Sequence, residues 1–230
     1  MSNCSYAKLS ENEIEKCILP FIPKNNRGFP SRFNVSDIFK CIVDKGKTGC
    51  QWSCLFIDIE CVNVPFSWQT VYYFYRKWCR QGVFKTMYDT CLEVQRDKLD
   101  TEKLNLDGPH TLYRVRPQFS AMVRKLNRKN ISVENCLLNA DKSFDSKSLI
   151  RCIQRNRTCP NIKENTRKRK CNETGQKRFY NHKVYQTRFV NERCFAWLDS
   201  FRTLLIRFDT LNESWLNWHY LAFALILSKV

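Results

Sequence analysis

Three acidic residues have the types and positions to do phosphodiester chemistry. Residues 104–106 alternate like a strand and run into Asp107, and the short apolar run 136–140 ends at Asp141, while Glu192 falls in a later helical pattern. Two divalent metals that cleave and join phosphodiesters need hard oxygen ligands held close together. Carboxylates at strand ends and on an adjacent helix converge in that way. From the residues alone, a turn or cap role for the aspartates and a surface role for the glutamate stay open.

The elements that would carry these residues follow from apolar spacing. The first half of the chain is helical, with helices predicted at 8–20, from Ser36 to Gly46, at 66–80 and from Val83 to Leu92. The second half mixes types: a helix at 117–129, a strand at 136–140, a helix capped by Asp145 and Ser146, a strand at 159–162, a long helix at 184–207 and a last helix from Ser214.

The predicted helix 66–80 has two different faces. Val71, Phe74, Tyr75 and Trp78 share an apolar face. The opposite face is polar and basic, and its candidate DNA-contacting residues are Gln69, Arg76, Lys77 and Arg80. Short helices with a basic, aromatic third helix suit a helix-turn-helix unit. A generic helical bundle with solvated charges fits the pattern equally well.

The charge balance points to a polyanionic partner. The net charge is +17 and the pI about 9.4, and residues 151–183 carry 11 basic against 2 acidic side chains. Their centre is the run Arg167, Lys168, Arg169 and Lys170. Nucleic acid is the leading partner, ahead of a membrane surface and of a basic protein without such a partner. The apolar run 215–230 is too short to span a bilayer and reads as a core helix.

The chain has 13 cysteines but no arrangement typical of a disulfide framework or a zinc site. The N-terminus lacks the apolar segment of a signal peptide, and Cys50 and Cys54 form one short pair without a second. The sequence therefore predicts reduced, mostly buried cysteines in a cytoplasmic protein.

Several motifs, in order, resemble DDE-type insertion-sequence transposases. Residues 139–146, NADKSFDS, are similar to the second-aspartate motif N-A-D-x-G-[FY]-D-[ST], and LDGPHT at 106–111 is similar to the first-aspartate strand. Tyr185, Arg188 and Glu192 match the signature of Tyr, two residues, Arg, three residues and Glu. Upstream, TGCQW at 48–52 and the segment 67–84 resemble the family's N-terminal helical module.

The resemblance implies an RNase H-like core with strands two and three and a helix between the first two aspartates. Only 33 residues separate Asp107 from Asp141, whereas that connection needs roughly fifty or more at ordinary strand and loop lengths. The sequence thus predicts a core that has lost most of its strand two–strand three hairpin. Asp107 would then be the worst placed of the three carboxylates, because its strand loses a neighbour.

The predicted fold is accordingly α+β or α/β: a helical, helix-turn-helix-like module over 1–98, followed by a truncated RNase H-like core over 99–230. The resemblance implies a transposase that cuts and joins DNA with Mg²⁺ or Mn²⁺, bound by Asp107, Asp141 and Glu192. It also implies that Tyr185 and Arg188 position Glu192 or contact phosphate. The alternative is a catalytically inactive DNA-binding remnant. Double-stranded DNA is the expected partner, a homodimer would fit unpaired strand edges, no membrane is involved, and the expected location is the nucleoid in the cytoplasm.

Overall fold

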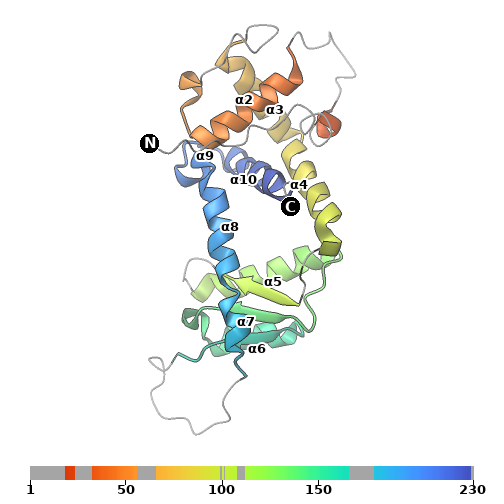
Figure 1. Cartoon of the computed structure of the whole chain (residues 1–230), viewed down its shortest axis with the longest axis vertical. Coiled ribbons are helices and arrows are strands. Elements are labelled where there is room, and N and C mark those ends of the chain that lie inside the picture. The colour runs from red at the N-terminus through yellow and green to blue at the C-terminus, as the bar shows by residue number, and fades with distance from the viewer. Residues whose placement is uncertain are drawn as a thin grey trace. The chain divides into compact units, whose positions relative to one another are not determined.

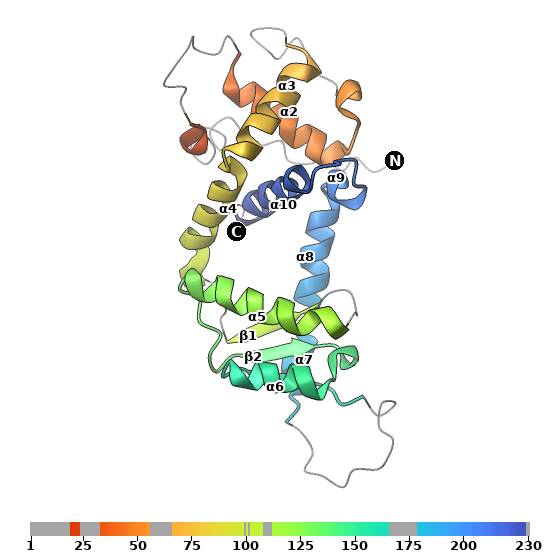
Figure 2. The ribbon, with the colours of Figure 1, turned by 180° about the vertical axis from the view of Figure 1, so that it is seen from behind.

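The computed structural model of the chain describes residues 19–23, 33–55, 66–98, 100, 102–107, 112–165 and 179–228. These residues form helices and one small parallel sheet (Figures 1 and 2). The helices are α2 (Val35–Thr48), α3 (Trp68–Arg80), α4 (Val83–Gln95), α5 (Leu112–Arg128), α6 (Lys147–Arg155), α7 (His182–Gln186), α8 (Phe189–Asp199), α9 (Arg202–Leu205) and α10 (Asn212–Leu227). The strands are β1 (Lys103–Leu106), β2 (Leu137–Ala140) and β3 (Cys159–Ile162). The predicted helix 8–20 lies outside the described residues except for a single 3₁₀ turn at Leu19–Phe21.

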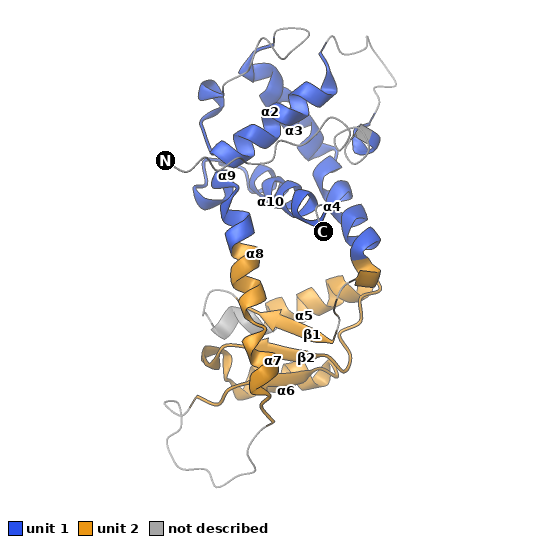
Figure 3. Ribbon diagram, viewed as in Figure 1, with its two compact units in different colours: residues 1–95, 196–230 blue, residues 96–195 orange. Residues whose placement is uncertain are grey.

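The chain divides into two compact units (Figure 3). Met1–Gln95 and Ala196–Val230 make up unit 1, and Arg96–Phe195 make up unit 2. The partition at residue 98 predicted from the sequence leaves the C-terminal segment with the sheet. In the structure that segment packs with the N-terminal helices instead, because the apolar α10 lies against α4 and also contacts α3.

The core of unit 1 is built by the amphipathic helices that the sequence predicts. The stripe Ile38, Phe39, Ile42 and Val43 of α2 is buried, and Val71, Tyr75 and Trp78 of α3 are buried beside it. The ring of Tyr75 stacks on Trp218 of α10 with centroids 4.4 Å apart, and its hydroxyl donates to the Ser214 carbonyl at 2.6 Å. Aromatic packing therefore joins α3 and α10, which lie far apart in the sequence, in one core.

A buried lysine fastens α2 to α9 and α10. Lys45 is 2% exposed, and its ammonium lies 5.2 Å from the Trp52 ring centroid and 5.0 Å from that of Trp218. It donates to the Thr203 hydroxyl at 3.2 Å, and that hydroxyl donates to the Lys45 carbonyl at 3.0 Å. Burial lowers the pKa of Lys45, while the two indole faces offset part of the cost of the buried charge.

Unit 2 contains the parallel sheet, in the order β1-β2-β3. Side chains alternate across it, so Leu104, Leu138 and Ile162 pack in the core formed with α5 and α6. Both views place α5 and α6 on this face and α7 on the other (Figures 1 and 2). The crossover helices α5, between β1 and β2, and α6, between β2 and β3, therefore lie on the same side of the sheet. Right-handed connections between parallel strands in this order require that placement.

The connection between β1 and β2 bears on the predicted loss of a hairpin. Among its described residues, 112–136, it holds the single helix α5 and no strand. β1 pairs only with β2 in the described sheet and forms its edge. The mixed helix and sheet class predicted from the sequence is confirmed.

Two helices differ from their predicted extent. The predicted helix 184–207 is wrong, since the structure has three helices, α7, α8 and α9, in its place. Hydroxyls cause local turns at both breaks, because Thr187 bonds the Val184 carbonyl at 2.7 Å and Ser200 bonds the Trp197 carbonyl at 2.6 Å. The predicted helix 117–129 begins earlier, at Leu112, so that Pro117 lies inside α5 rather than at its start.

Helix caps also differ in detail from the sequence prediction. α2 is capped by Asn34, whose side chain accepts from the Ser36 N–H, and it continues past Gly46 to end at the left-handed Gly49. Ser146 caps α6 as predicted, by accepting from Leu149 N–H. The carboxylate of Asp145, the residue before this cap, accepts from the Asn165 N–H at 2.8 Å.

The described cysteines are free thiols, but most are not buried. Of these nine, only Cys79 and Cys136 are buried, so the predicted burial is wrong for this part of the chain. Within the described residues, no helix combines the length and apolarity needed to cross a membrane.

Replacing Gly49 by Ala should destabilise unit 1 more than the same change at Gly82. Both glycines have positive φ, 66° and 69°, so alanine is strained by about 1–2 kcal/mol at either position. At Gly49 the new Cβ would also lie 2.8 Å from Arg202 Cβ, whereas at Gly82 nothing lies within 4 Å. Urea unfolding should therefore show a further loss of about 1–3 kcal/mol for Gly49→Ala. Equal losses in the two variants would contradict the close docking of α9 on α2.

Candidate functional site

The two predicted catalytic aspartates lie at neighbouring positions on one edge of the sheet. Leu106 of β1 pairs with Ala140 of β2 in parallel register, and Asp107 and Asp141 are the next residues of these strands. Parallel backbones run about 5 Å apart, so Asp107 and Asp141 follow adjacent strands at the same end of the sheet. β3 ends at Ile162, paired with Ala140, which places Lys163 at the corresponding position of the third strand.

The carboxylate of Asp141 is contacted by Ser143, Tyr185 and Arg188. Its Oδ2 accepts from the Ser143 N–H at 3.1 Å. Its Oδ1 accepts from the Tyr185 hydroxyl at 3.4 Å and lies 3.4 Å from Nη1 of Arg188. The Arg188 guanidinium also lies over the Tyr185 ring, 5.3 Å from its centroid. Asp141, Tyr185 and Arg188, which come from two distant sequence motifs, are therefore in contact.

The electrostatics of Asp141 reflect these neighbours. Burial by itself would raise the pKa of this carboxyl, but the hydrogen bonds from Ser143 and the charge of Arg188 outweigh burial, so the pKa is lower than usual. Burial raises the pKa of the Tyr185 hydroxyl, and the adjacent Asp141 acts in the same direction against Arg188. The site therefore holds an ionised carboxylate beside a protonated phenol and a guanidinium.

A ladder of asparagine side chains brings Tyr185 to this place. Asn105, Asn139 and Asn161 occupy paired positions of β1, β2 and β3. Asn139 Nδ2 donates to Asn105 Oδ1 at 3.0 Å, and Asn161 Nδ2 donates to Asn139 Oδ1 at 2.7 Å. Asn139 and Asn161 are fully buried. The three amides thus link the strands on the face opposite α5 and α6.

The same amides hold the segment that contains α7. Asn161 Oδ1 accepts from the Asn181 N–H at 2.7 Å, and Asn161 Nδ2 also donates to the Asn181 carbonyl at 3.0 Å. Asn139 Nδ2 donates to the Val184 carbonyl at 3.3 Å. Asn181 caps α7 by accepting from the Val184 N–H. Tyr185 follows directly, so the ladder fixes where its side chain starts.

The prediction of site residues from sequence missed these asparagines, although the sequence carries a signal for them. β1 ends in Leu-Asn-Leu and β2 in Leu-Asn-Ala, each followed by an aspartate, and β3 contains Pro-Asn-Ile. An asparagine two residues before each aspartate, between apolar residues, predicts a polar row on the opposite sheet face. That row needs partners when it is buried.

Glu192 does not join the two aspartates. It lies exposed in the first turn of α8, one helical turn after Arg188. The part of the chain that the structure describes contains no group of three or more His, Cys, Asp or Glu side chains that could hold a metal ion. Asp107 and Asp141 have the oxygen chemistry that Mg²⁺ prefers. The observed arrangement nevertheless does not fit a metal centre made by all three carboxylates, because a guanidinium, not a third carboxylate, faces Asp141.

The predicted DNA-contacting residues of α3 differ in their exposure. Gln69 and Arg80 are exposed and Lys77 is half-buried. Arg76 is also half-buried and donates to the Ser214 hydroxyl at the start of α10. Arg76 therefore has a structural partner within unit 1, and the Lys77 ammonium lies 5.9 Å from the Phe74 ring centroid. The run Arg167–Lys170 lies outside the described residues.

Comparisons with protein-family models, curated proteins and solved structures find no match to this chain.

Replacing Arg188 by Gln should raise the pKa of Asp141 toward its ordinary value. The change removes the cation that favours the ionised carboxylate. Because the folded pKa lies below the unfolded one, this carboxylate contributes stability above the unfolded pKa, and that contribution is lost as pH falls through the folded pKa. The variant should lose part of this contribution. Carbon-detected NMR titration of the Asp141 carboxyl measures the shift directly.

Arg155→Gln provides the control, since Arg155 is an exposed cation of unit 2 at the end of α6. It should leave the Asp141 pKa unchanged. An equal shift in both variants would mean that net charge, rather than the Arg188 contact, sets this pKa.

Proposed function

We propose that this chain is a duplex-DNA-binding protein with the frame of a DDE-type transposase, in which DNA binding persists while strand cleavage is weak or absent. The observation that carries the proposal is the contact of Tyr185 and Arg188 with Asp141, beside Asp107. The transposase resemblance selected these four residues from separate motifs. Chance similarity gives no reason for such motifs to meet at one sheet edge.

The sheet order supports the same frame. In an RNase H-like core, the strands carrying the first two aspartates belong to one sheet, with two further strands between them in the chain. Here β1 and β2 are parallel neighbours joined through α5. This is the arrangement expected when the intervening hairpin is lost and the two aspartate-bearing strands stay paired.

The charge distribution supports DNA as the partner. The chain carries a net charge of +17, and α3 presents Lys77 and Arg80 beside the polar Gln69. Cationic side chains on a helix neutralise phosphates and release counterions, a term that supplies most of the affinity in non-specific DNA binding.

Weak cleavage follows from the arrangement around Asp141. Phosphodiester cleavage by paired metals requires several carboxylates directed at one place. Here Arg188 neutralises Asp141, and Glu192 is not gathered with the two aspartates. An active transposase remains a second candidate, favoured by the neighbouring positions of Asp107 and Asp141 in the parallel register.

The test measures binding and cleavage on one preparation. In a mobility-shift titration with duplex DNA, neutralisation of about six phosphates gives a log–log salt slope of roughly −5. Replacing both Lys77 and Arg80 by Gln should reduce the slope by about 2. The control, Lys85→Gln with Arg96→Gln, removes the same charge from α4 and the turn after it, and should change the slope less. A slope near zero for the unaltered chain would refute DNA binding.

Cleavage is assayed with Mn²⁺ on a supercoiled plasmid. We expect little or no nicking by the unaltered chain under conditions in which it binds the plasmid. Robust metal-dependent nicking that Asp141→Asn abolishes would instead establish the active-transposase candidate.

A further inference from the structure

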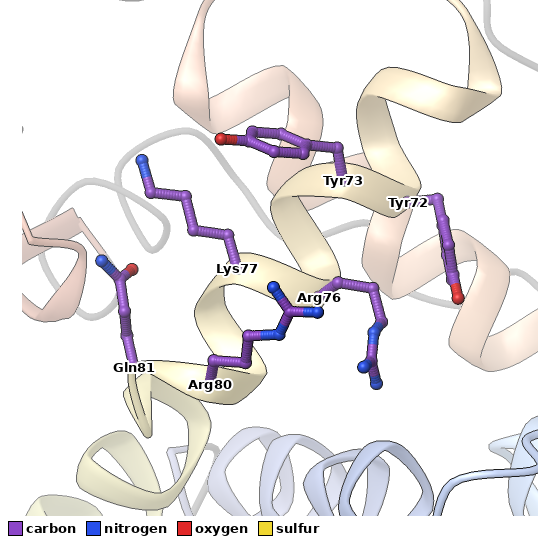
Figure 4. A pocket seen from close by; sticks show the side chains of 6 residues that line it. All are labelled: Tyr72, Tyr73, Arg76, Lys77, Arg80 and Gln81. Carbon is purple, nitrogen blue, oxygen red and sulfur yellow. The ribbon is translucent and has the colours of Figure 1, made fainter. Parts of the chain in front are cut away.

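A hollow of about 580 Å³ lies along the outer side of α3. It is lined by Tyr72, Tyr73, Arg76, Lys77, Arg80 and Gln81, drawn in Figure 4. Three of these residues are cations, two are tyrosines, and none is acidic. The hollow is therefore both aromatic and positively charged.

Helical spacing sorts the lining residues into two adjacent rows. Tyr73, Lys77 and Gln81 follow one another at intervals of four, as do Tyr72, Arg76 and Arg80. Figure 4 shows Tyr73 and Lys77 extending from one side of the helix and Tyr72 and Arg76 from the other. Each row thus begins with a ring followed by a cation, and the rows end in Gln81 and Arg80.

The two rings are not equally accessible. Tyr72 is 39% exposed and packs edge-on against Trp52, with centroids 5.1 Å apart. Tyr73 is 60% exposed and touches Phe74 edge-on at 5.5 Å. An aromatic ring with so large an exposed fraction contributes little to folding. It does offer a face on which a planar group can stack.

We infer that this hollow binds single-stranded nucleic acid, with an unpaired base stacked on Tyr73 and the adjoining phosphates at Lys77 and Arg80. Exposed aromatics within a positively charged groove bind single strands in this way, because every base has a stacking face and every nucleotide a phosphate. Arg76, held by Ser214, adds positive charge to the floor. The inference rests on the proposed function and names a second form of its nucleic-acid ligand.

A paired duplex would use the same residues differently. Its bases are stacked on each other, so it presents only their edges and the phosphates. Tyr73 would then act through its hydroxyl, as a donor to phosphate. Removing only the Tyr73 hydroxyl, or the whole ring, therefore distinguishes duplex binding from single-strand binding.

The experiment compares Tyr73→Phe with Tyr73→Ala in the full chain. Fluorescence anisotropy is measured with a labelled thymidine oligonucleotide and with a labelled duplex at the same ionic strength. Alanine should weaken single-strand binding roughly 5- to 150-fold, and phenylalanine should stay within about twofold of the unaltered chain. Duplex binding should fall much less in the alanine variant. Phe179→Ala, which removes an exposed ring of unit 2, is the matched control and should change neither affinity.

Four results would overturn the inference. Phenylalanine as damaging as alanine would assign the contact to the hydroxyl, and equal losses for single strand and duplex would make Tyr73 a general phosphate contact. Unchanged affinities in Tyr73→Ala would remove Tyr73 from the interface, although duplex binding by the unaltered chain would still stand. If the unaltered chain binds neither ligand, the proposed function fails as well.

Discussion

The amide ladder formed by the half-buried Asn105 and the buried Asn139 and Asn161 is the interaction on which the arrangement of unit 2 depends. Buried polar groups are costly unless they are hydrogen-bonded, and here each amide finds its partner on the next strand. The ladder therefore allows only a register in which the three asparagines are aligned. The same register places Asp107 beside Asp141. A slip of one residue would turn the amides into the apolar core.

The ladder also determines what faces Asp141. Through Asn161 and Asn139 it binds the backbone of the segment that leads into Tyr185. The turn after α7 then brings Arg188 over the Tyr185 ring and onto the carboxylate. The apolar face of the sheet stabilises the unit, while its polar face positions the charged residues. The site thus contains an ionised Asp141 paired with Arg188, and Asp107 follows the adjacent strand.

The sequence predicted individual helices and strands better than the distant residues against which they pack. The apolar stripes of α2 and α3, the strands ending at Asp107 and Asp141, and the Ser146 cap are confirmed because each follows from spacing within a few residues. The split of 184–207 was not predicted, because hydroxyl-to-carbonyl bonds within one turn do not change apolar periodicity. The packing of α10 with α4 and the contact of Arg76 with Ser214 depend on residues more than a hundred positions apart. The ladder was not predicted because a single asparagine within an apolar strand shows no partner until the register of the three strands is known.

The pKa of Asp141 in the variant Asn161→Ala tests most directly whether the amide ladder positions Tyr185 and Arg188. Asn161 lies on β3, and its side-chain bonds go to Asn139 and to Asn181. If the ladder positions the Tyr185–Arg188 segment, removing Asn161 should raise the Asp141 pKa toward its ordinary value, in the same direction as removal of Arg188. The combined variant should then shift little further than Arg188→Gln alone. An unchanged Asp141 pKa in a folded Asn161→Ala variant would contradict the account, because the site would then be assembled without the ladder.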